Sequence, residues 1–248
     1  MITKETENRF PLSSKYDRKW MQENEMGPNV LWLTEYLLED FPLKEEMRVL
    51  DLGCGKACSS IFLAKEKQVK VFAADLWIRP EINLKNIKDF KLEDQVFPLS
   101  CEARNLPFAH EYFDAIVSID AYQYFGTDDF YLSYLMQFLK PKGYLGLVMP
   151  GAKKEIDSSI INHFGELWDS EIECFHTKKW WSKHFSKTGL VDVKIADELE
   201  KGWQYWLEWE SQNEADNMIN PDKGSDLEFI KKDNGEFISF IRIVAQKK

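Results

Sequence analysis

Short apolar runs and amphipathic segments alternate through the middle of the chain. Five runs rich in β-branched and aromatic residues predict strands, at Arg48–Leu52, Val69–Leu76, Gln95–Ser100, Phe113–Ile119 and Tyr144–Met149. Segments with helical spacing, such as Ser59–Glu66 and Asp129–Leu139, lie between most of them. This alternation predicts βαβ units, and therefore an α/β fold with a mostly parallel sheet covered by helices on both faces.

The two ends of the chain have a different pattern. Residues 1–47 form an N-terminal segment in which Val30–Leu38 has helical spacing before Pro42. After Pro150, residues 152–189 and about 198–235 read as helical insertions, the second with a turn cluster at 220–224. Leu190–Ala196 and Glu236–Val244 read as two further strands. We therefore expect one domain over residues 48–248 with seven strands.

Composition and charge exclude several classes of protein. The 248 residues carry a formal net charge of −10 and no long basic block, which disfavours a nucleic-acid partner. The chain shows neither a signal-peptide pattern nor an apolar run long enough to insert in a membrane, so we expect a cytoplasmic protein. Its four cysteines lack the paired spacing of a metal site, which favours reduced thiols and no bound metal.

The most informative stretch joins the first strand to the helix that follows. It reads Asp51-Leu52-Gly53-Cys54-Gly55, an Asp-x-Gly-x-Gly turn, in which glycines let a ligand approach the backbone. Asp75 ends the next strand about twenty residues later, where a carboxylate can accept hydrogen bonds from both ribose hydroxyls. The alternative is that Asp75 only caps the next helix.

The same stretch bears on which nucleotide is bound. A dinucleotide fingerprint requires a third glycine, and Cys58 stands at that position. Asp51 would repel a pyrophosphate but suits a cationic ligand.

At this point the chain resembles the class I S-adenosylmethionine (SAM)-dependent methyltransferases. Five segments match that family's motifs in order: Val49–Gly55, Asp75, Glu102–Phe108, Phe113–Ser118 and Leu139–Leu145. They look most similar to the small-molecule branch with ubiquinone/menaquinone-type and sarcosine-type enzymes. Two positions depart from the pattern: Ala57 stands where the family often has Gly, and Glu102 replaces the commoner Asp.

The resemblance implies a Rossmann-like sheet with an antiparallel last strand. It also implies SAM as cofactor, S-adenosylhomocysteine (SAH) as product, and a small-molecule N, O or S acceptor. The N-terminal segment is expected to cover the cofactor. The residues implied to bind the cofactor are Tyr16, Asp51, Gly53, Gly55, Asp75, Leu76, Glu102, Ala103 and Ser118.

The acceptor side is predicted from position. Methyl transfer mainly requires the acceptor to be held in line, and a base is needed only if the acceptor loses a proton early. Asp120 and Tyr122 follow the fourth strand, where the reacting centre should lie, and His176 is the candidate general base. Two of the predicted residues have a structural alternative. For Asp120 it is the cap of a turn, and for Tyr16 it is packing at the rim of the sheet.

The sequence leaves alternatives open for the C-terminal region, for the function and for the oligomeric state. The tryptophan-rich C-terminal region either forms core or shapes the acceptor pocket, and we expect most of its tryptophans to be core with one or two lining the pocket. Alternative functions are a cyclopropane-synthase-like enzyme acting on lipid chains, a SAM-binding module without turnover, and an NAD-dependent oxidoreductase. We expect a monomer or a homodimer.

Overall fold

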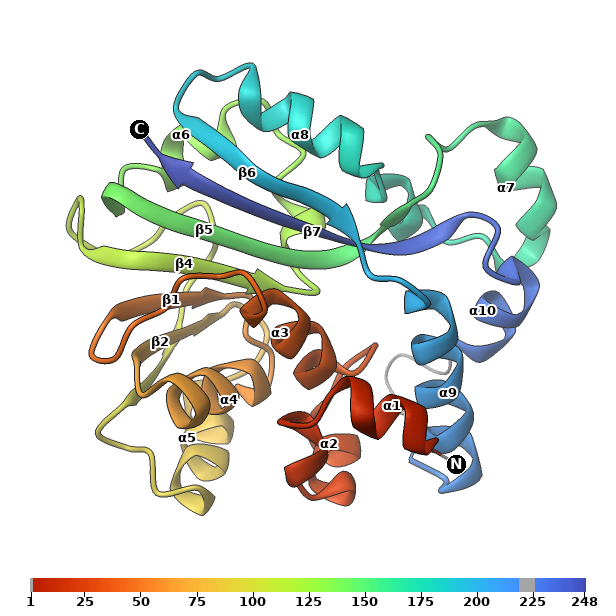
Figure 1. Cartoon of the computed structure of the whole chain (residues 1–248), viewed down its shortest axis with the longest axis horizontal. Coiled ribbons are helices and arrows are strands. Elements are labelled where there is room, and N and C mark those ends of the chain that lie inside the picture. Colours follow the sequence, from red (N-terminus) through yellow and green to blue (C-terminus); the bar gives the residue numbers. More distant parts are fainter. Residues whose placement is uncertain (1, 219–225) are drawn as a thin grey trace.

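The protein is described here by a computed structural model, which covers residues 2–218 and 226–248. Its centre is one seven-stranded sheet (Figure 1). The strands are β1 (Arg48–Leu52), β2 (Lys70–Asp75), β3 (Val96–Ser100), β4 (Phe113–Ile119), β5 (Leu139–Ala152), β6 (Val191–Glu198) and β7 (Ile238–Lys247). The predicted turn cluster at 220–224 lies outside the described residues.

The strand order is β3-β2-β1-β4-β5-β7-β6. Strands β1 to β5 pair in parallel, whereas β7 is antiparallel to both β5 and β6. The order reverses between β1 and β4, and ligands of open α/β sheets bind at the carboxyl ends of the strands beside such a reversal. The predicted Rossmann-like sheet with an antiparallel last strand is confirmed.

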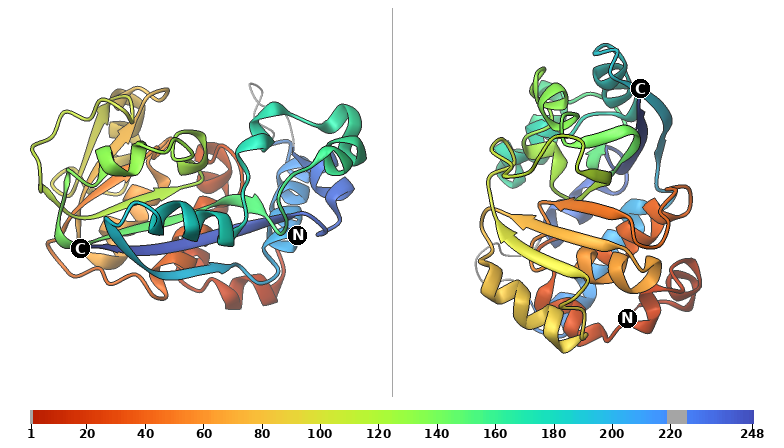
Figure 2. Two further views of the ribbon diagram at one scale, coloured as in Figure 1. Left: turned by 90° about the horizontal axis from the view of Figure 1, so that it is seen from above. Right: turned by 90° about the vertical axis from the view of Figure 1, so that its left-hand side faces the viewer.

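Alternate residues of the central strands feed two separate cores. Val49, Val71 and Val117 belong to one core, packed under α3 (Val30–Leu38), α4 (Cys58–Lys67) and α5 (Pro80–Asp89). Leu50 and Ile116 belong to the other, under α6 (Tyr131–Leu135) and α8 (Lys178–Ser186). Both faces of these strands are buried, which is why the runs are continuously apolar. Figure 2 shows the helices on either side of the sheet.

The predicted helix over Asp129–Leu139 is shorter than expected. Helix α6 ends at Leu135, and β5 already begins at Leu139, which pairs with Phe113 of β4. The last residue of the predicted helix therefore belongs to the sheet. In the same strand Lys142 has φ of 63°, so the turn before the buried half of β5 needs a left-handed residue.

The N-terminal helices pack against the C-terminal part of the chain. Helices α1 (Lys4–Arg9) and α2 (Arg18–Asn24) lie beside α9 (Gly202–Ala215) in Figure 1. Glu208 of α9 accepts a hydrogen bond from Thr6 at 2.6 Å, and Gln22 of α2 donates to Asp216 at 2.8 Å. The N-terminal helices and α9, which are about 200 residues apart in the sequence, thus pack side by side.

The remaining insertions flank the sheet. Residues 152–189 contain α7 (Ser158–Phe164), the short 3₁₀ turns η3 (Gly165–Leu167) and η4 (Ser170–Cys174), and α8. Helix α10 (Leu227–Asp233) precedes β7. Among the described residues, no helix has the length and apolar character needed to cross a bilayer.

Candidate active site

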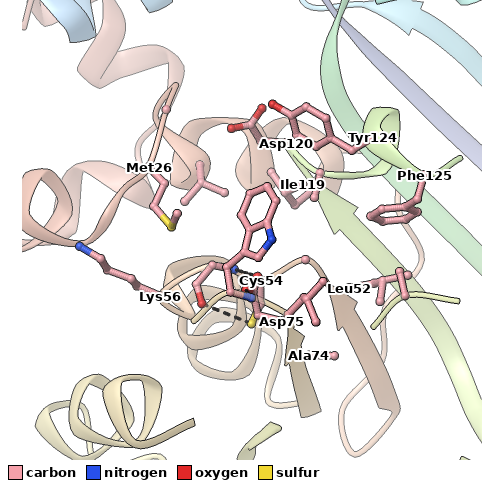
Figure 3. Close-up of a pocket in the computed structure, with 18 of the residues that line it drawn as sticks. Met26, Leu52, Cys54, Lys56, Ala74, Asp75, Ile119, Asp120, Tyr124 and Phe125 are labelled. Carbon is pink, nitrogen blue, oxygen red and sulfur yellow. Dashed lines mark hydrogen bonds between the residues drawn. The ribbon is translucent and has the colours of Figure 1, made fainter. Parts of the chain in front are cut away.

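A cavity of about 520 Å³ lies at the carboxyl ends of β1, β2 and β4 (Figure 3). Five segments build most of its wall. They are the link between α2 and α3, the glycine turn after β1, and the segments that follow β2, β3 and β4. The volume is in the range of small-molecule and cofactor sites.

The glycine turn is held close to the segment after β4. Gly53 has φ of +75°, and a Cβ placed on it would lie 2.4 Å from the Cβ of Ala121. Gly55 has φ of +53°, and its added Cβ would contact the Met26 sulfur at 3.4 Å. Gly53 is therefore required by protein packing itself, in addition to any approach of a ligand.

Ala57 continues the turn with φ of 66° and is fully buried. The family's more frequent glycine at this position fits that left-handed conformation, which costs an L-residue about 1–2 kcal/mol. The departure noted in the sequence thus leaves the loop's shape intact but strained.

Asp75 ends β2 and lines the cavity. Its Oδ2 accepts from the Gly55 amide at 2.8 Å, while Oδ1 accepts from the amides of Trp77 and Ile78 at 2.8 and 2.9 Å. These bonds hold the turn after β2, whereas the next helix, α5, has Arg79 at its N-cap, so Asp75 does not cap that helix. A carboxylate has about four acceptor positions, so Asp75 keeps room for a ligand hydroxyl.

Asp51 stands behind the turn and does not line the cavity. It is fully buried, and its Oδ2 accepts from the hydroxyls of Ser59 and Ser60, both at 2.6 Å. Burial raises its pKa to about 6, against the opposing effect of the two serine hydrogen bonds. In this structure Asp51 fixes the start of α4 to the end of β1.

The other residues implied to bind the cofactor divide into two groups. Leu76, Glu102 and Ala103 line the cavity. Glu102 accepts from the Arg104 amide at 2.7 Å and pairs with its guanidinium at 3.1 Å. Ser118 lies outside the cavity wall and donates to the carbonyl of Leu52 at 2.6 Å, joining β4 to β1.

On the opposite side of the cavity, Asp120 and Tyr124 lie together (Figure 3). Asp120 has φ of 57°, an uncommon conformation for a non-glycine residue and one found at functional sites. The Tyr124 hydroxyl is 3.5 Å from Glu171 of η4. Burial, followed by the charges of Asp120 and Glu171, raises the pKa of Tyr124. This half of the cavity is acidic and aromatic.

Besides Asp51 and Ser118, three more predicted residues do not line the cavity. Tyr122 is fully buried, and its hydroxyl makes no hydrogen bond within the described residues. His176 stacks on Trp180 at 3.7 Å and contacts Glu155 at 2.9 Å. Tyr16 packs against Phe62 and bonds Glu66 at 3.1 Å. For Tyr16 this matches the packing alternative.

The tail tryptophans also lie outside the cavity wall. Trp181 and Trp209 are fully buried, and Trp206 is 4% exposed. The expectation that most of them are core is confirmed, whereas the expectation that one or two line the pocket is wrong. Trp209 packs against Trp32 of α3 in one sheet core, and Trp181 packs against Tyr122 in the other.

Several cavity residues were not predicted from sequence, chiefly Glu25, Met26, Trp77 and Tyr124. Glu25 and Met26 precede the Gly27-Pro28 break between two helices, a signal of an irregular segment that could have drawn attention to them. Tyr124 lies in the stretch after the fourth strand, but the sequence did not show which of its aromatic residues faces the cavity.

With this geometry established, we compared the chain with known proteins. A family model described as a methyltransferase domain matches residues 49–143. Methyltransferase GfsG of Streptomyces halstedii is 26% identical over 173 residues, which cover 68% of this chain and 62% of GfsG. The chain thus spans less than two thirds of that relative.

Solved structures show the same fold at low identity. Phosphoethanolamine N-methyltransferase 2 of Haemonchus contortus, in complex with SAM, superposes with a TM-score of 0.70 and 20% identity, over 99% of this chain and 57% of that one. A geranyl diphosphate methyltransferase in complex with SAM gives a TM-score of 0.67 and 16% identity, over 87% and 84%. Residues 49–143 thus match a methyltransferase domain, and the chain has the fold of the class I SAM-dependent methyltransferases.

Proposed function

We propose that the protein transfers a methyl group from SAM to a small-molecule N, O or S acceptor held in the cavity at the carboxyl ends of β1, β2 and β4. The observation that carries the proposal is that one cavity is lined by the glycine turn, by Asp75 and Glu102, and by Asp120 after β4. Residues matched to separate motifs of the family therefore converge on a single site.

The residues present fit the cofactor. The left-handed glycines leave the backbone of the turn open to a ligand, and Asp75 retains acceptor capacity for a ribose hydroxyl. The wall also carries more acidic than basic side chains, which suits a sulfonium ion and an ammonium group. When bound, SAM supplies an activated methyl group on a positively charged sulfur.

In this proposal Asp75 and Gly55 form one unit that binds the ribose. Leu76, Glu102 and Ala103 border the base, while the link between α2 and α3 covers the site. Asp51 and Ser118 act from behind the wall: Asp51 fixes the start of α4, and Ser118 fixes β4 against β1. Tyr16 packs against Trp20 of α2 and Phe62 of α4, and so supports the helix that leads into the covering link.

Asp120 and Tyr124 are placed to contact the acceptor. Their side chains lie on the wall opposite Asp75, so a ligand spanning the cavity would meet both sides (Figure 3). Asp120 would orient an acceptor or take its proton, and Tyr124 would offer an aromatic face. We assign Tyr122 and His176 to supporting the wall.

The direct test is a panel of candidate acceptors incubated with the protein and methyl-labelled SAM, beside a thermal shift with SAH. We expect SAH to raise the melting temperature and label to appear on one acceptor class. Asp75→Ala should remove the shift. Absence of any SAH effect on the folded protein would contradict the proposal.

A further inference from the structure

Glu25 is a buried carboxyl on the cavity wall, in the link between α2 and α3. It is 8% exposed, and neither carboxylate oxygen has a hydrogen bond of good geometry among the described residues, since the amides of Val30 and Leu31 at the start of α3 make only weaker contacts with it. Burial raises its pKa well above the ordinary range, although the nearby amides of Val30 and Leu31 oppose this. A carboxyl left in this state costs free energy unless a partner satisfies it.

The surroundings of Glu25 are acidic. Asp120 after β4 and Glu210 of α9 lie close enough for their charges to raise its pKa further, and the Cys58 thiol faces it from α4. The basic residues on the cavity wall are engaged elsewhere. Lys56 donates to the carbonyl of Glu23 at 2.9 Å, and Arg104 pairs with Glu102.

A positive charge on a ligand would compensate the buried Glu25 and its acidic neighbours. The same cavity offers the aromatic side chains of Trp77 and Tyr124, and aromatic faces attract cations. A buried acid beside aromatic faces favours an organic cation over a hydrated inorganic one, because the cation's alkyl groups match the apolar lining.

We propose that Glu25 holds a positively charged nitrogen of the methyl acceptor, with Asp120 as the second negative group and Trp77 and Tyr124 as its aromatic lining. This inference rests on the proposed function and narrows it to acceptors that carry an amine. Where that nitrogen itself receives the methyl group, its ammonium form first gives a proton to Glu25 or Asp120, because the new bond forms from the free lone pair. Glu25 ionises when the cation enters, so binding of the cation releases the proton that burial keeps on the carboxyl.

The ammonium group of the cofactor's amino-acid portion is a second cation that Glu25 would attract. Two binding experiments separate the sources. Each compares the wild type with Glu25→Gln, which keeps the shape of the side chain and removes its charge. Glu23→Gln is the matched control, because Glu23 lies two positions away on α2 with a half-exposed side chain.

The first experiment measures acceptor-side binding to SAH-saturated protein. The probes are choline and its neutral isostere, in which carbon replaces the nitrogen. We expect the wild type and Glu23→Gln to prefer choline by about tenfold, and Glu25→Gln to lose that preference. Equal binding of the two probes to the wild type, or an unchanged preference in Glu25→Gln, would overturn the proposal.

The second experiment measures cofactor-side binding. SAH is compared with methylthioadenosine, which lacks the amino-acid portion of the cofactor. We expect Glu25→Gln to bind both as the wild type does. Selective loss of SAH affinity in Glu25→Gln would assign Glu25 to the cofactor's ammonium and overturn the acceptor assignment. If SAH fails to bind even the wild type, it is the proposed function that fails.

The pH dependence of the preference for choline is a further test, because a purely structural role of Glu25 would leave that preference independent of pH. Because the cation must displace a proton from Glu25, the preference for choline should grow as pH rises in the wild type and stay flat in Glu25→Gln. A preference in the wild type that does not change with pH would place the cation on another group.

Discussion

The Oδ2 atom of Asp75 accepts a hydrogen bond from the backbone amide of Gly55 at 2.8 Å, and so ties the end of β2 to the glycine turn after β1. Both residues line the cavity. The hydrogen bond makes the acid and the glycines one rigid unit instead of two independent contacts, since the other oxygen of Asp75 is fixed by the amides of Trp77 and Ile78.

Asp75→Ala should therefore weaken binding of SAM and SAH by about 1.5–3 kcal/mol, the scale of a lost charge-assisted hydrogen bond. Part of that loss comes from a turn that is no longer preorganised. Calorimetric titration measures the affinity, and circular dichroism checks that the variant is folded. A folded Asp75→Ala protein with wild-type affinity would remove Asp75 from the cofactor site.

Gly53→Ala should destabilise the protein by about 1–3 kcal/mol, because the new methyl meets Ala121 and the backbone is left-handed there. Urea denaturation gives the free energy of unfolding. In the double variant Gly53→Ala with Ala121→Gly, the contact is relieved but the backbone strain persists, so stability should recover only in part. Strict additivity of the two single changes would show that the contact is absent.

Asp51 should make the protein less stable as pH rises. Its pKa is about 6 in the folded chain, above its ordinary value of 3.8, so between about pH 4 and pH 6 the unfolded chain loses a proton that the folded chain keeps. Stability should fall across this window by up to about 3 kcal/mol. Asp51→Asn should flatten the fall, measured as the free energy of unfolding against pH.

Asp114 is the control of opposite sign. Burial there is outweighed by hydrogen bonds from Lys140 and the Arg48 amide, so its pKa is lowered. Asp114→Asn should remove stability that the wild type has at neutral pH and loses in acid. If the pH profile of Asp51→Asn matched the wild type, Asp51 would already be ionised in the folded protein.

Tyr122→Phe should be neutral or stabilise the protein by about 1 kcal/mol, because it deletes a buried hydroxyl that has no partner among the described residues. If Tyr122 only supports the wall, turnover on the true acceptor should persist. The measurements are thermal unfolding and initial rates. A stable Tyr122→Phe protein with strongly reduced turnover would restore the catalytic role predicted from sequence.

Asp120→Asn should lower turnover while SAM affinity stays near that of the wild type, the pattern of a group used on the acceptor side. His176→Ala should instead change stability more than turnover, since it removes a stacking partner of Trp180 and a contact to Glu155. Steady-state kinetics beside calorimetry distinguish the two. Equal losses of turnover and SAM affinity in Asp120→Asn would make Asp120 a cofactor or structural residue.

The sequence by itself determined the sheet. The bounds expected for β1 and β4 agree with the structure, because these strands are buried on both faces and their apolar runs end at polar turns. It also located one part of the cavity wall, at Gly53, Gly55 and Asp75, because the turn geometry and the spacing to the next strand are local properties.

Only the tertiary structure decided which side chains line the wall opposite Asp75. Tyr122 and Tyr124 are two residues apart in a 3₁₀ turn, yet one is in the core and the other on the cavity wall. Glu25 reaches the site through the link between α2 and α3, and its acidic surroundings include Glu210 from the far end of the chain. Which side chain faces a cavity depends on contacts between distant segments, and neither spacing nor hydrophobic periodicity along the chain encodes those contacts.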